Sequence, residues 1–450
     1  EPATSSFFGH AVSTAGDMNG DGYGDVIIGA YLYDAGGRST AGACYVVFGH
    51  NNETAFEEID FSSVSLTSNA GFEIWGNPTY RVGLAVAGGF DLNNDGFSDV
   101  AVQATADSYV IFGHNTSTPF NKLDLIDLYS SSKSWGFRII GGTPSLSSAG
   151  DINADGTDDI IIGVKGDTYL DRSYCGIAFI IFGHPSSTGH SFDNVDLTSW
   201  VTTEELGVRV LGAAAGDQLG GSVGGGVDIN ADGVADLVIG APFADPFGRN
   251  NAGTVSIFFG YAGISGDIDT LTASLPYNKG YKIFGAVADD NLGDSVALFA
   301  NMNHQNIGSM MIAATCADSL NRHEAGVVTV IYGKMESPTA IPTLSPSSHP
   351  SKSPTQLPTT VPTTMPTHGA RYIDLHDWQA NITSGFQVAG PQSGSKFGFC
   401  VSDAGDINKD GYSDIIIGAP DGDPLSRGAL SGVVYLLFGK EGEMPDVNTA

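Results

Sequence analysis

The sequence predicts an all-β fold, a β-propeller of four-stranded antiparallel blades, together with an extended polyproline II-like linker. Three observations support this. An acidic nonapeptide followed by two short apolar runs recurs six times in the 450 residues. No helical period competes with these runs. One segment has proline at every fourth position. A repeat of this length indicates units that pack mainly against their neighbours.

The six nonapeptides share aspartate, asparagine and glycine positions. They occupy residues 17–25, 91–99, 151–159, 228–236, 301–309 and 406–414. Each is followed by a β-branched run such as DVIIGA and by a second run that ends in an aromatic residue and glycine, such as YVVFG. Short runs of this kind, bounded by Gly, Asp and Asn, are typical of strands. A further strand precedes each loop, and a fourth, such as GFEIWG, follows the second run. Four antiparallel strands per repeat describe blades of a six- or seven-bladed ring.

The acidic loops, the GAP turns at 240–242 and 418–420 and the terminal FG of each repeat resemble the FG-GAP repeats of integrin α-chain heads. The resemblance covers nearly the whole chain outside the linker. It implies a seven-bladed, integrin α-like propeller that uses the face opposite its calcium loops to bind ligands. Six repeats are counted here, so the blade number stays open.

The D-x-N-x-D-G-x-x-D loops predict calcium sites. Side chains at positions one, three, five and nine and the carbonyl at position seven supply oxygen ligands, which select Ca²⁺ over softer metals. Glycine at position six permits the left-handed turn. The expected ligands are Asp17, Asn19, Asp21, Tyr23, Asp25, Asp91, Asn93, Asp95, Phe97, Asp99, Asp151, Asn153, Asp155, Thr157, Asp159, Asp228, Asn230, Asp232, Val234, Asp236, Asp406, Asn408, Asp410, Tyr412 and Asp414.

The loop at 301–309 lacks every charged ligand, because Asn301, Asn303, Gln305 and Ser309 replace them. We therefore expect five Ca²⁺ ions and none at 301–309. An EF-hand is excluded, since position twelve is apolar or glycine inside a strand. An Asx-turn without metal is the alternative, because Asp and Asn favour tight turns anyway.

Residues 336–368 form a Pro/Ser/Thr-rich tetrapeptide linker between five propeller repeats at 1–335 and a sixth repeat at 369–450. Proline at every fourth position favours an extended rod of about 100 Å at about 3.1 Å per residue. The composition resembles the stalks of secreted algal glycoproteins and predicts O-glycosylation; a bare spacer is the alternative. The candidate sites follow the prolines: Thr339, Thr343, Ser347, Ser351, Thr355, Thr359, Thr363 and Thr367.

The segment after the linker resembles the start of an integrin α-chain, where an N-terminal strand closes the ring. One hypothesis is therefore a fibre in which neighbouring protomers share strands; a single propeller with a large insertion is the alternative. The chain opens at Glu1 without Met or a signal peptide, as expected for a processed or cropped product. N-glycosylation sequons occur at Asn52, Asn115 and Asn381.

Arginines recur in the hairpins between second and third strands, usually four residues after an aspartate. They are Arg38, Arg172, Arg249, Arg322 and Arg427. They predict either local Asp–Arg pairs that steady each hairpin or a face for acidic glycans or a partner protein.

The net charge of −31 argues against nucleic acid and anionic membranes as partners. No apolar run is long enough to insert into a membrane. Four cysteines without a CxxC pair favour small buried strand residues, with one or two disulfides as the alternative. No catalytic constellation appears, since the G-x-S-x-G at 220–224 precedes no helix.

We expect an extracellular or cell-surface structural or adhesive glycoprotein, not an enzyme, that self-associates or binds another extracellular protein or glycan. A lectin-like module and the accessory propeller of a secreted hydrolase or lyase are the alternatives.

Overall fold

The computed structural model describes most of the chain. The described residues are 6–50, 66, 69–117, 120–128, 134–142, 145–185, 192–203, 205–271, 279–300, 302, 307–319, 322–333, 372–374, 385–423, 432–440 and 447–448. The linker, Asn52, Asn381 and Arg427 lie outside them, so the expectations for those positions stay predictions.

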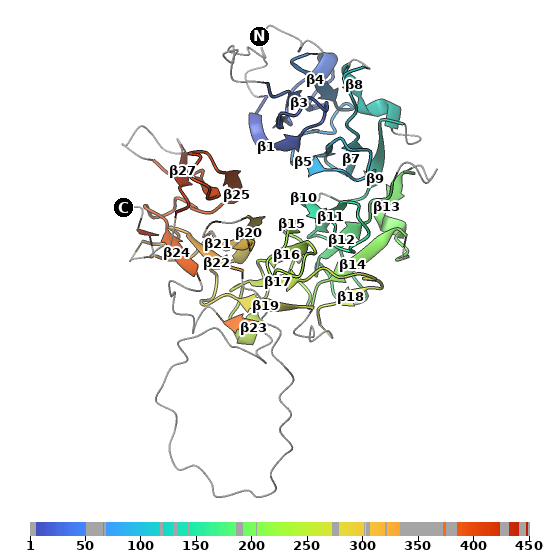
Figure 1. Cartoon of the computed structure of the whole chain (residues 1–450). Helices are drawn as coiled ribbons and strands as arrows, with labels where there is room; N and C mark the ends of the chain where they lie inside the picture. Colours follow the sequence, from blue (N-terminus) through green and yellow to red (C-terminus); the bar gives the residue numbers. More distant parts are fainter. Residues whose placement is uncertain are drawn as a thin grey trace, which may run out of the picture.

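Six small sheets stand around a common axis as the blades of a propeller, which confirms the all-β fold class (Figure 1). In the described residues the helices are short 3-10 turns, such as η2 (Leu125–Leu128), η4 (Leu197–Ser199) and η5 (Pro246–Gly248). None of the helices found there has the length and apolar character needed to cross a membrane.

The first three blades follow one pattern, with the innermost strand first. Blade one contains β1 (Phe8–Gly16), β2 (Asp25–Ala30), β3 (Ala43–Val47), β4 (Gly71–Trp75) and β8 (Leu123–Asp124). Blade two contains β5 (Val86–Phe90), β6 (Asp99–Gln103), β7 (Asp107–Ile111), β9 (Gly136–Ile140) and β13 (Val195–Asp196). Blade three contains β10 (Ser145–Gly150), β11 (Asp159–Val164), β12 (Ile177–Ile181), β14 (Gly207–Leu211) and β18 (Ile268–Asp269).

Blades four and five repeat the pattern, and the described part of blade six stops at three strands. Blade four contains β15 (Val223–Val227), β16 (Asp236–Ala241), β17 (Thr254–Phe258), β19 (Gly280–Phe284) and β23 (Tyr372–Asp374). Blade five contains β20 (Leu292–Phe299), β21 (Ser309–Ala314), β22 (Val327–Tyr332), β24 (Gly385–Ala389) and β28 (Val447–Asn448). Blade six contains β25 (Cys400–Gly405), β26 (Asp414–Ala419) and β27 (Val433–Leu437).

A short fifth strand on each of the first five blades was not expected from the sequence. It pairs in parallel with the fourth strand and comes from the following repeat; β8, for example, joins Leu123 to Ile74. Repeats two to six therefore each add a strand to the blade before them. The signal was present in the sequence as a recurring aliphatic residue followed by Asp or Asn at 123–124, 195–196, 268–269, 373–374 and 447–448.

The segment after the linker lies in blades four and five of this same chain. β23 pairs with β19 of blade four, and β24 pairs with β22 as the fourth strand of blade five. The sequence had predicted that this segment would close the ring. These pairings instead place the linker inside the fifth blade, as in the alternative of a single propeller with an insertion.

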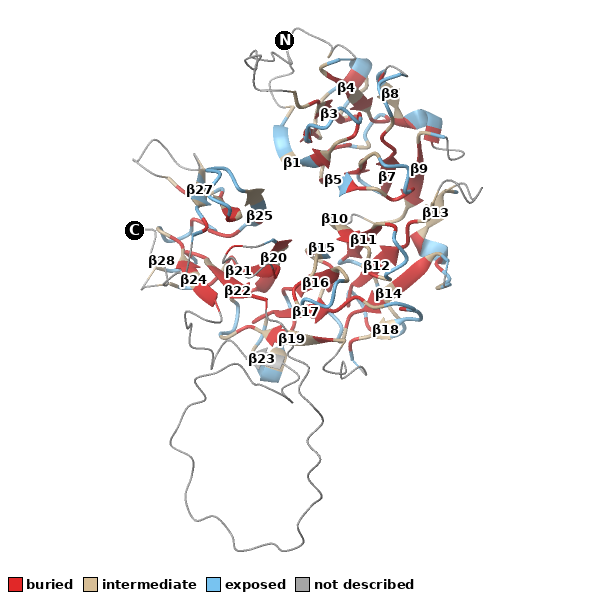
Figure 2. Ribbon diagram, in the orientation of Figure 1, coloured by how far each residue is buried: buried red, intermediate tan, exposed pale blue. Residues whose placement is uncertain are grey.

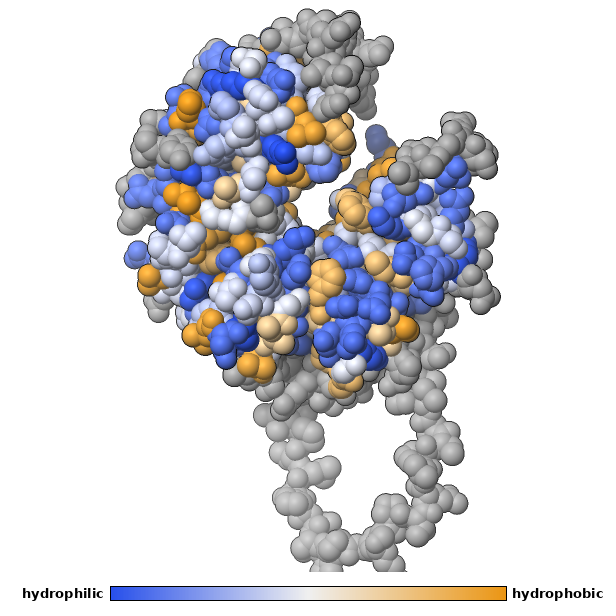
Figure 3. Space-filling view, turned by 180° about the vertical axis from the view of Figure 1, so that it is seen from behind, coloured by the Kyte–Doolittle hydropathy of each residue, from blue (hydrophilic) through white to orange (hydrophobic). Residues whose placement is uncertain are grey.

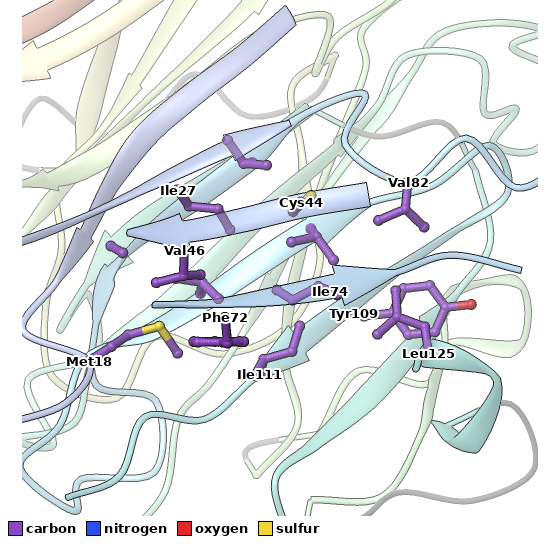
Figure 4. Close-up of a cluster of buried hydrophobic side chains, with 14 of the residues drawn as sticks. Met18, Ile27, Cys44, Val46, Phe72, Ile74, Val82, Tyr109, Ile111 and Leu125 are labelled. Atoms are coloured by element: carbon purple, nitrogen blue, oxygen red, sulfur yellow. The ribbon is translucent and has the colours of Figure 1, made fainter. Parts of the chain in front are cut away.

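Most of the core lies between successive blades, and one small further cluster, which includes Ala30, Ala43 and Tyr45, lies within blade one (Figure 2). Between blades one and two, Val46, Phe72 and Ile74 pack with Tyr109 and Ile111 (Figure 4). Four further clusters repeat this arrangement down to blades five and six. The physical reason is that a lone twisted sheet cannot bury both of its faces.

All four cysteines are free. Cys44 and Cys175 are buried, Cys316 is half-buried and Cys400 is exposed. The structure therefore favours the interpretation of the cysteines as ordinary residues of the blades over that of a disulfide framework.

Candidate calcium-binding loops and the opposite face

The acidic loops connect the first and second strands of the blades, so they lie together at one end of the propeller. The hairpins between second and third strands lie at the opposite end, because antiparallel strands reverse direction at each turn. The two sets of candidate residues therefore belong to opposite faces of the disc.

All five acidic loops share one hydrogen-bond pattern, shown here by the loop at 151–159. The Asp151 carboxylate accepts from Asp155 N at 2.9 Å and from Gly156 N at 2.8 Å. The Asn153 side chain accepts from Asp155 N and donates to Asp155 Oδ2. Asp155 Oδ1 accepts from Thr157 N at 2.9 Å. The side chains at positions one, three and five thus curl the loop around themselves, as the spacing predicted.

Two positions in each loop adopt left-handed backbone. Gly156 at position six has φ +90°, as expected, and Ala154 at position four has φ +58°. The second of these was not predicted. The equivalent residues Asn94, Ala231 and Lys409 are also left-handed, so four loops hold a side chain in a conformation that costs a non-glycine residue about 1 kcal/mol.

The aspartate at position nine has a structural role that the sequence analysis missed. Asp159 is fully buried, and its carboxylate accepts from Ile152 N at 3.1 Å and from Gly183 N at 2.9 Å. It therefore joins the start of its own loop to the glycine after the third strand. Asp25, Asp99, Asp236 and Asp414 make the same two contacts.

The loop at 301–309 shows what replaces this contact. Ser309 occupies position nine and is fully buried, but its hydroxyl is too short to bridge the two amides, and Gly333 N donates to Gly308 O instead. Ser309 Oγ has no hydrogen-bond partner among the described residues. The rest of this loop, apart from Met302, Ile307 and Gly308, lies outside those residues.

Burial raises the pKa of Asp25, Asp99, Asp159 and Asp236, which each occupy position nine of their loop. Desolvation, followed by repulsion from the two other loop acids, raises the pKa of Asp159 to about 8, that of Asp236 to about 7 and that of Asp25 to about 6. The pKa of Asp99 is raised well above its ordinary value for the same reasons. A protein that buries a carboxylate beside two others either protonates it or places a cation there.

The donor set fits a hard cation. It consists of oxygen atoms alone, and each carboxylate keeps lone pairs beyond those that accept loop N–H groups. In the described residues, however, no three His, Cys, Asp or Glu side chains converge in the geometry of a metal centre. The loop thus presents the expected ligands at the expected positions, held by hydrogen bonds to its own backbone.

Neighbouring loops also contact one another. Asp17 N donates to Ser98 Oγ at 3.2 Å, and Asp91 N donates to Asp158 Oδ2 at 2.9 Å. In both cases the acceptor is position eight of the next loop. Asn94 of the second loop donates to Gly156 O of the third. The loops therefore link adjacent blades, which the sequence analysis did not anticipate.

On the opposite face, Arg38, Arg172 and Arg249 donate hydrogen bonds to other residues of the protein. Arg38 donates two hydrogen bonds to Asp124, at 2.9 and 2.5 Å, and one to Gly76 O. Arg172 binds Asp269 and Gly212 O in the same way. Arg249 donates to Pro246 O and Ala286 O. The side chains of Arg38 and Arg172 are thus partnered within the protein rather than displayed to a ligand.

The aspartates four residues before these arginines do not pair with them. Asp34 accepts from Thr40 N, Asp245 from Asn251 N and Asp318 from Glu324 N. These acids hold the hairpin backbone instead. The predicted local pair of Arg38 with Asp34 is therefore wrong. Arg38 pairs instead with the fifth strand of the same blade, and so does Arg172, which has Thr168 four residues before it.

The sequon at Asn115 lies between β7 and the fourth strand β9, on an exposed turn. Asn115 Oδ1 accepts from Ser117 N at 3.1 Å and also from the Ser117 hydroxyl. The G-x-S-x-G segment behaves as the sequence analysis expected. It leads into β15, and Ser222 Oγ donates to Gly293 O.

Comparison with known proteins finds similarity to FG-GAP repeats in three segments of the chain. The FG-GAP repeat matches residues 8–47, 219–258 and 402–437, which lie in blades one, four and six. A phosphatidylinositol-glycan-specific phospholipase D of Bos taurus is 31% identical over 192 residues, covering 40% of this chain and 21% of the relative. Integrin alpha pat-2 of Caenorhabditis briggsae is 39% identical over 101 residues, 22% of this chain and 7% of the relative.

A third relative, integrin alpha-E of Mus musculus, is 34% identical over 113 residues, covering 24% of this chain and 9% of the relative. The chain spans about a fifth of the length of the phospholipase D relatives and less of the integrins. These similarities support an FG-GAP propeller like that of integrin α-chains and glycan-specific phospholipases D.

Proposed function

We propose that this chain is an extracellular, calcium-stabilised propeller that works by presenting surfaces in a structural or adhesive glycoprotein, not by catalysing a reaction. The observation that carries this proposal is the set of five acidic loops with one shared hydrogen-bond pattern at one end of the disc. Extracellular calcium, in the millimolar range, fills even weak sites of this kind.

When bound, calcium would supply positive charge next to a buried carboxylate. In each loop the residues at positions one, three, five and nine and the carbonyl at position seven would hold it. The chain's own contribution is to fix those positions. The position-nine acid ties the loop to the third strand, and in the third loop position eight ties it to the loop of the preceding blade. A cation at this point would therefore stabilise the junction between blades.

Calorimetric titration of the calcium-free protein tests this proposal. We expect five sites, because the loop at 301–309 lacks carboxylates. A matched pair of variants tests which loops bind calcium. Asp151→Ala removes a ligand from the third loop and should leave four sites, whereas Asn303→Ala in the fifth loop should leave five. Absence of calcium binding to the folded protein would refute the calcium part of the proposal.

The adhesive role is tested by the protein's assembly state in calcium. A propeller that carries a glycosylated linker and self-associates should form beads or filaments under the electron microscope, while a lone ring argues against a fibre. Glycosylation is checked by peptide mass spectrometry at Asn115, with Asn115→Gln as the control.

A second candidate is favoured by one observation. The similarity to phosphatidylinositol-glycan-specific phospholipases D covers more of the chain than the integrin similarity does. The chain would then serve as the non-catalytic propeller beside a hydrolase. Binding of the isolated propeller to glycan arrays, without self-association, would favour this candidate over the fibre.

A further inference from the structure

The acidic loops of blades one to four follow one another around the disc. They are the first loop (17–25), the second (91–99), the third (151–159) and the fourth (228–236). Figures 1 and 3 show the blades side by side along an arc, so each of these loops lies next to the loop of an adjacent blade. The three junctions between the four loops can therefore be compared position by position.

The second and third loops contact each other through polar side chains. Asp158, at position eight of the third loop, accepts a hydrogen bond from Asp91 N through Oδ2 at 2.9 Å. Asn94, at position four of the second loop, donates to Gly156 O at 3.0 Å. Gly156 immediately precedes Thr157, whose carbonyl is an expected calcium ligand, and Asp91 is itself an expected ligand. The two loops are thus joined at, or next to, the residues that would hold calcium.

A backbone path joins the same two loops. Asp159 accepts a hydrogen bond from Gly183 N at 2.9 Å, and the next residue, His184, donates its backbone N–H to Leu92 O of the second loop at 3.0 Å. The equivalent bonds at the other two junctions join His114 N to Met18 O and Tyr261 N to Ile152 O. This path is therefore common to all three junctions, and the side chains make the difference between them.

Asp158 brings a negative charge to its junction. Its carboxylate repels the carboxylates of Asp91 and Asp151, which occupy position one of the second and third loops. Position eight is not among the expected ligand positions, so Asp158 stays outside both sets of ligands. A cation in either loop would be attracted by Asp158 and would offset the repulsion that Asp158 exerts there.

The two neighbouring junctions lack this carboxylate. At the first junction Ser98 fills position eight and accepts from Asp17 N at 3.2 Å through a neutral hydroxyl. At the third junction Ala235 fills it, and a methyl group has no acceptor. Position four is Gly20 in the first loop and Ala154 in the third, so neither has the amide that the second loop uses. Hydrogen bonds to a charged acceptor are roughly twice as strong as neutral ones, which makes the middle junction the strongest.

We propose that Asp158 is a positioning residue shared by two calcium sites, so that calcium in the second loop raises the calcium affinity of the third loop, and the reverse. This inference rests on the proposed function, since it concerns how calcium fills the loops assigned to it. An ion in one loop orders the residues that form the contact, so the next ion has less of its own loop to order. The charge of Asp158 offsets part of the repulsion between the two ions. The coupling is reciprocal by thermodynamic linkage.

Calcium titration followed by hydrogen exchange measures each loop separately. Gly96 N and Gly156 N donate to the position-one aspartates of their own loops, so peptides that contain them report the filling of the second and third loops. Asp91→Ala empties the second loop and should raise the calcium midpoint of the third loop by about fivefold. The matched control, Asp228→Ala, removes the same ligand from the fourth loop and should leave that midpoint nearly unchanged.

Variants at position eight test Asp158 itself. With Asp158→Ala the second loop should lose about fivefold in calcium affinity, and Asp91→Ala should then no longer shift the midpoint of the third loop. Asp158→Asn keeps an acceptor for Asp91 N without the charge and should retain part of the coupling. A purely structural role would lower the melting temperature of Asp158→Ala in EGTA but would leave the third loop indifferent to Asp91→Ala in the parent protein.

A gain of coupling is the sharpest test. Ala235→Asp supplies the missing carboxylate at the junction of the third and fourth loops, where Gly150 lies opposite Ala235 as Gly16 lies opposite Ser98. In this variant the midpoint of the third loop should respond to Asp228→Ala.

Two results would overturn the inference, and they are distinguishable. If Asp91→Ala leaves the midpoint of the third loop unchanged while calcium still protects the remaining loops, the coupling is absent and the calcium proposal stands. If calcium protects none of the loops in the folded parent protein, the inference and the calcium proposal both fail.

Discussion

The guanidinium of Arg172 donates two hydrogen bonds to the carboxylate of Asp269, both at 2.8 Å, across 97 residues of sequence. Arg172 lies in a hairpin of blade three, and Asp269 belongs to the fifth strand of the same blade, which the next repeat supplies. The Arg38–Asp124 pair repeats this relationship in blade one. These two pairs thus fasten the second and fourth repeats to the blades before them.

Removing Arg172 should destabilise the protein by about 2 kcal/mol, because Asp269 and the Gly212 carbonyl would lose a partner that is itself only 10% exposed. Chemical denaturation of Arg172→Ala measures this, with the exposed Lys440→Ala as the control. A double-mutant cycle with Asp269→Asn isolates the pair. A coupling energy near zero would show that the contact is incidental.

Chelation of calcium should lower the melting temperature by many degrees. Ligand that binds only the folded state stabilises it by about 2.7 kcal/mol per site at a concentration one hundred times the dissociation constant. Differential scanning calorimetry in calcium and in excess EGTA measures the shift, with magnesium as the comparison cation. The same melting curve in both buffers would contradict a stabilising role for calcium.

The position-nine carboxylate should stabilise the fold even without metal. Asp159→Ser copies the fifth loop. It leaves Gly183 N without its acceptor and Ile152 N with Gly150 O alone, which should cost about 2 kcal/mol in EGTA. Asp159→Asn keeps a side-chain acceptor and should cost less. Denaturation curves in EGTA and in calcium separate this contribution from that of the metal. An unaffected Asp159→Ser in EGTA would mean that the two hydrogen bonds contribute nothing by themselves.

The left-handed positions of the third loop predict opposite effects. Gly156→Ala at φ +90° should lower stability by about 1 kcal/mol through backbone strain alone, because no atom lies near its Cβ position. Ala154→Gly at φ +58° relieves the same kind of strain and should be neutral or mildly stabilising. Thermal unfolding of the two variants checks the sign, and a loss of similar size in both would argue against strain as the cause.

Stability should fall as the pH rises from about 4 to 6 because of Asp217. Burial raises the pKa of this carboxyl from 3.8 to about 6, so the folded state binds more protons than the unfolded state in that window, and unfolding becomes easier as the pH rises. Asp217→Asn removes the titration and keeps an acceptor for Ala214 N. We expect the variant to gain about 2 kcal/mol relative to the parent between pH 4 and 7. Parallel pH series of the two proteins measure this, and parallel curves would contradict it.

Much of the fold could be read from the residues alone. The runs DVIIGA, DIIIGV and DLVIGA form second strands over the predicted residues, and GFEIW forms a fourth strand. Loop curling around Asp151 and the left-handed Gly156 also followed from sequence. These features depend on local spacing and on backbone sterics, which act over a few residues.

Contacts between residues of different repeats were decided only by the tertiary structure. The partner of Arg172 is Asp269 rather than a nearby aspartate, and the segment after the linker belongs to blades four and five. Asp158, at position eight of the third loop, accepts a hydrogen bond from Asp91 N, at position one of the second loop. The repeat pattern is the same in every copy, so sequence alone determines each blade but does not say which blade a given edge or face meets. That depends on how many sheets pack around the axis, and the exposed Val434 and Val12 mark where the described packing stops.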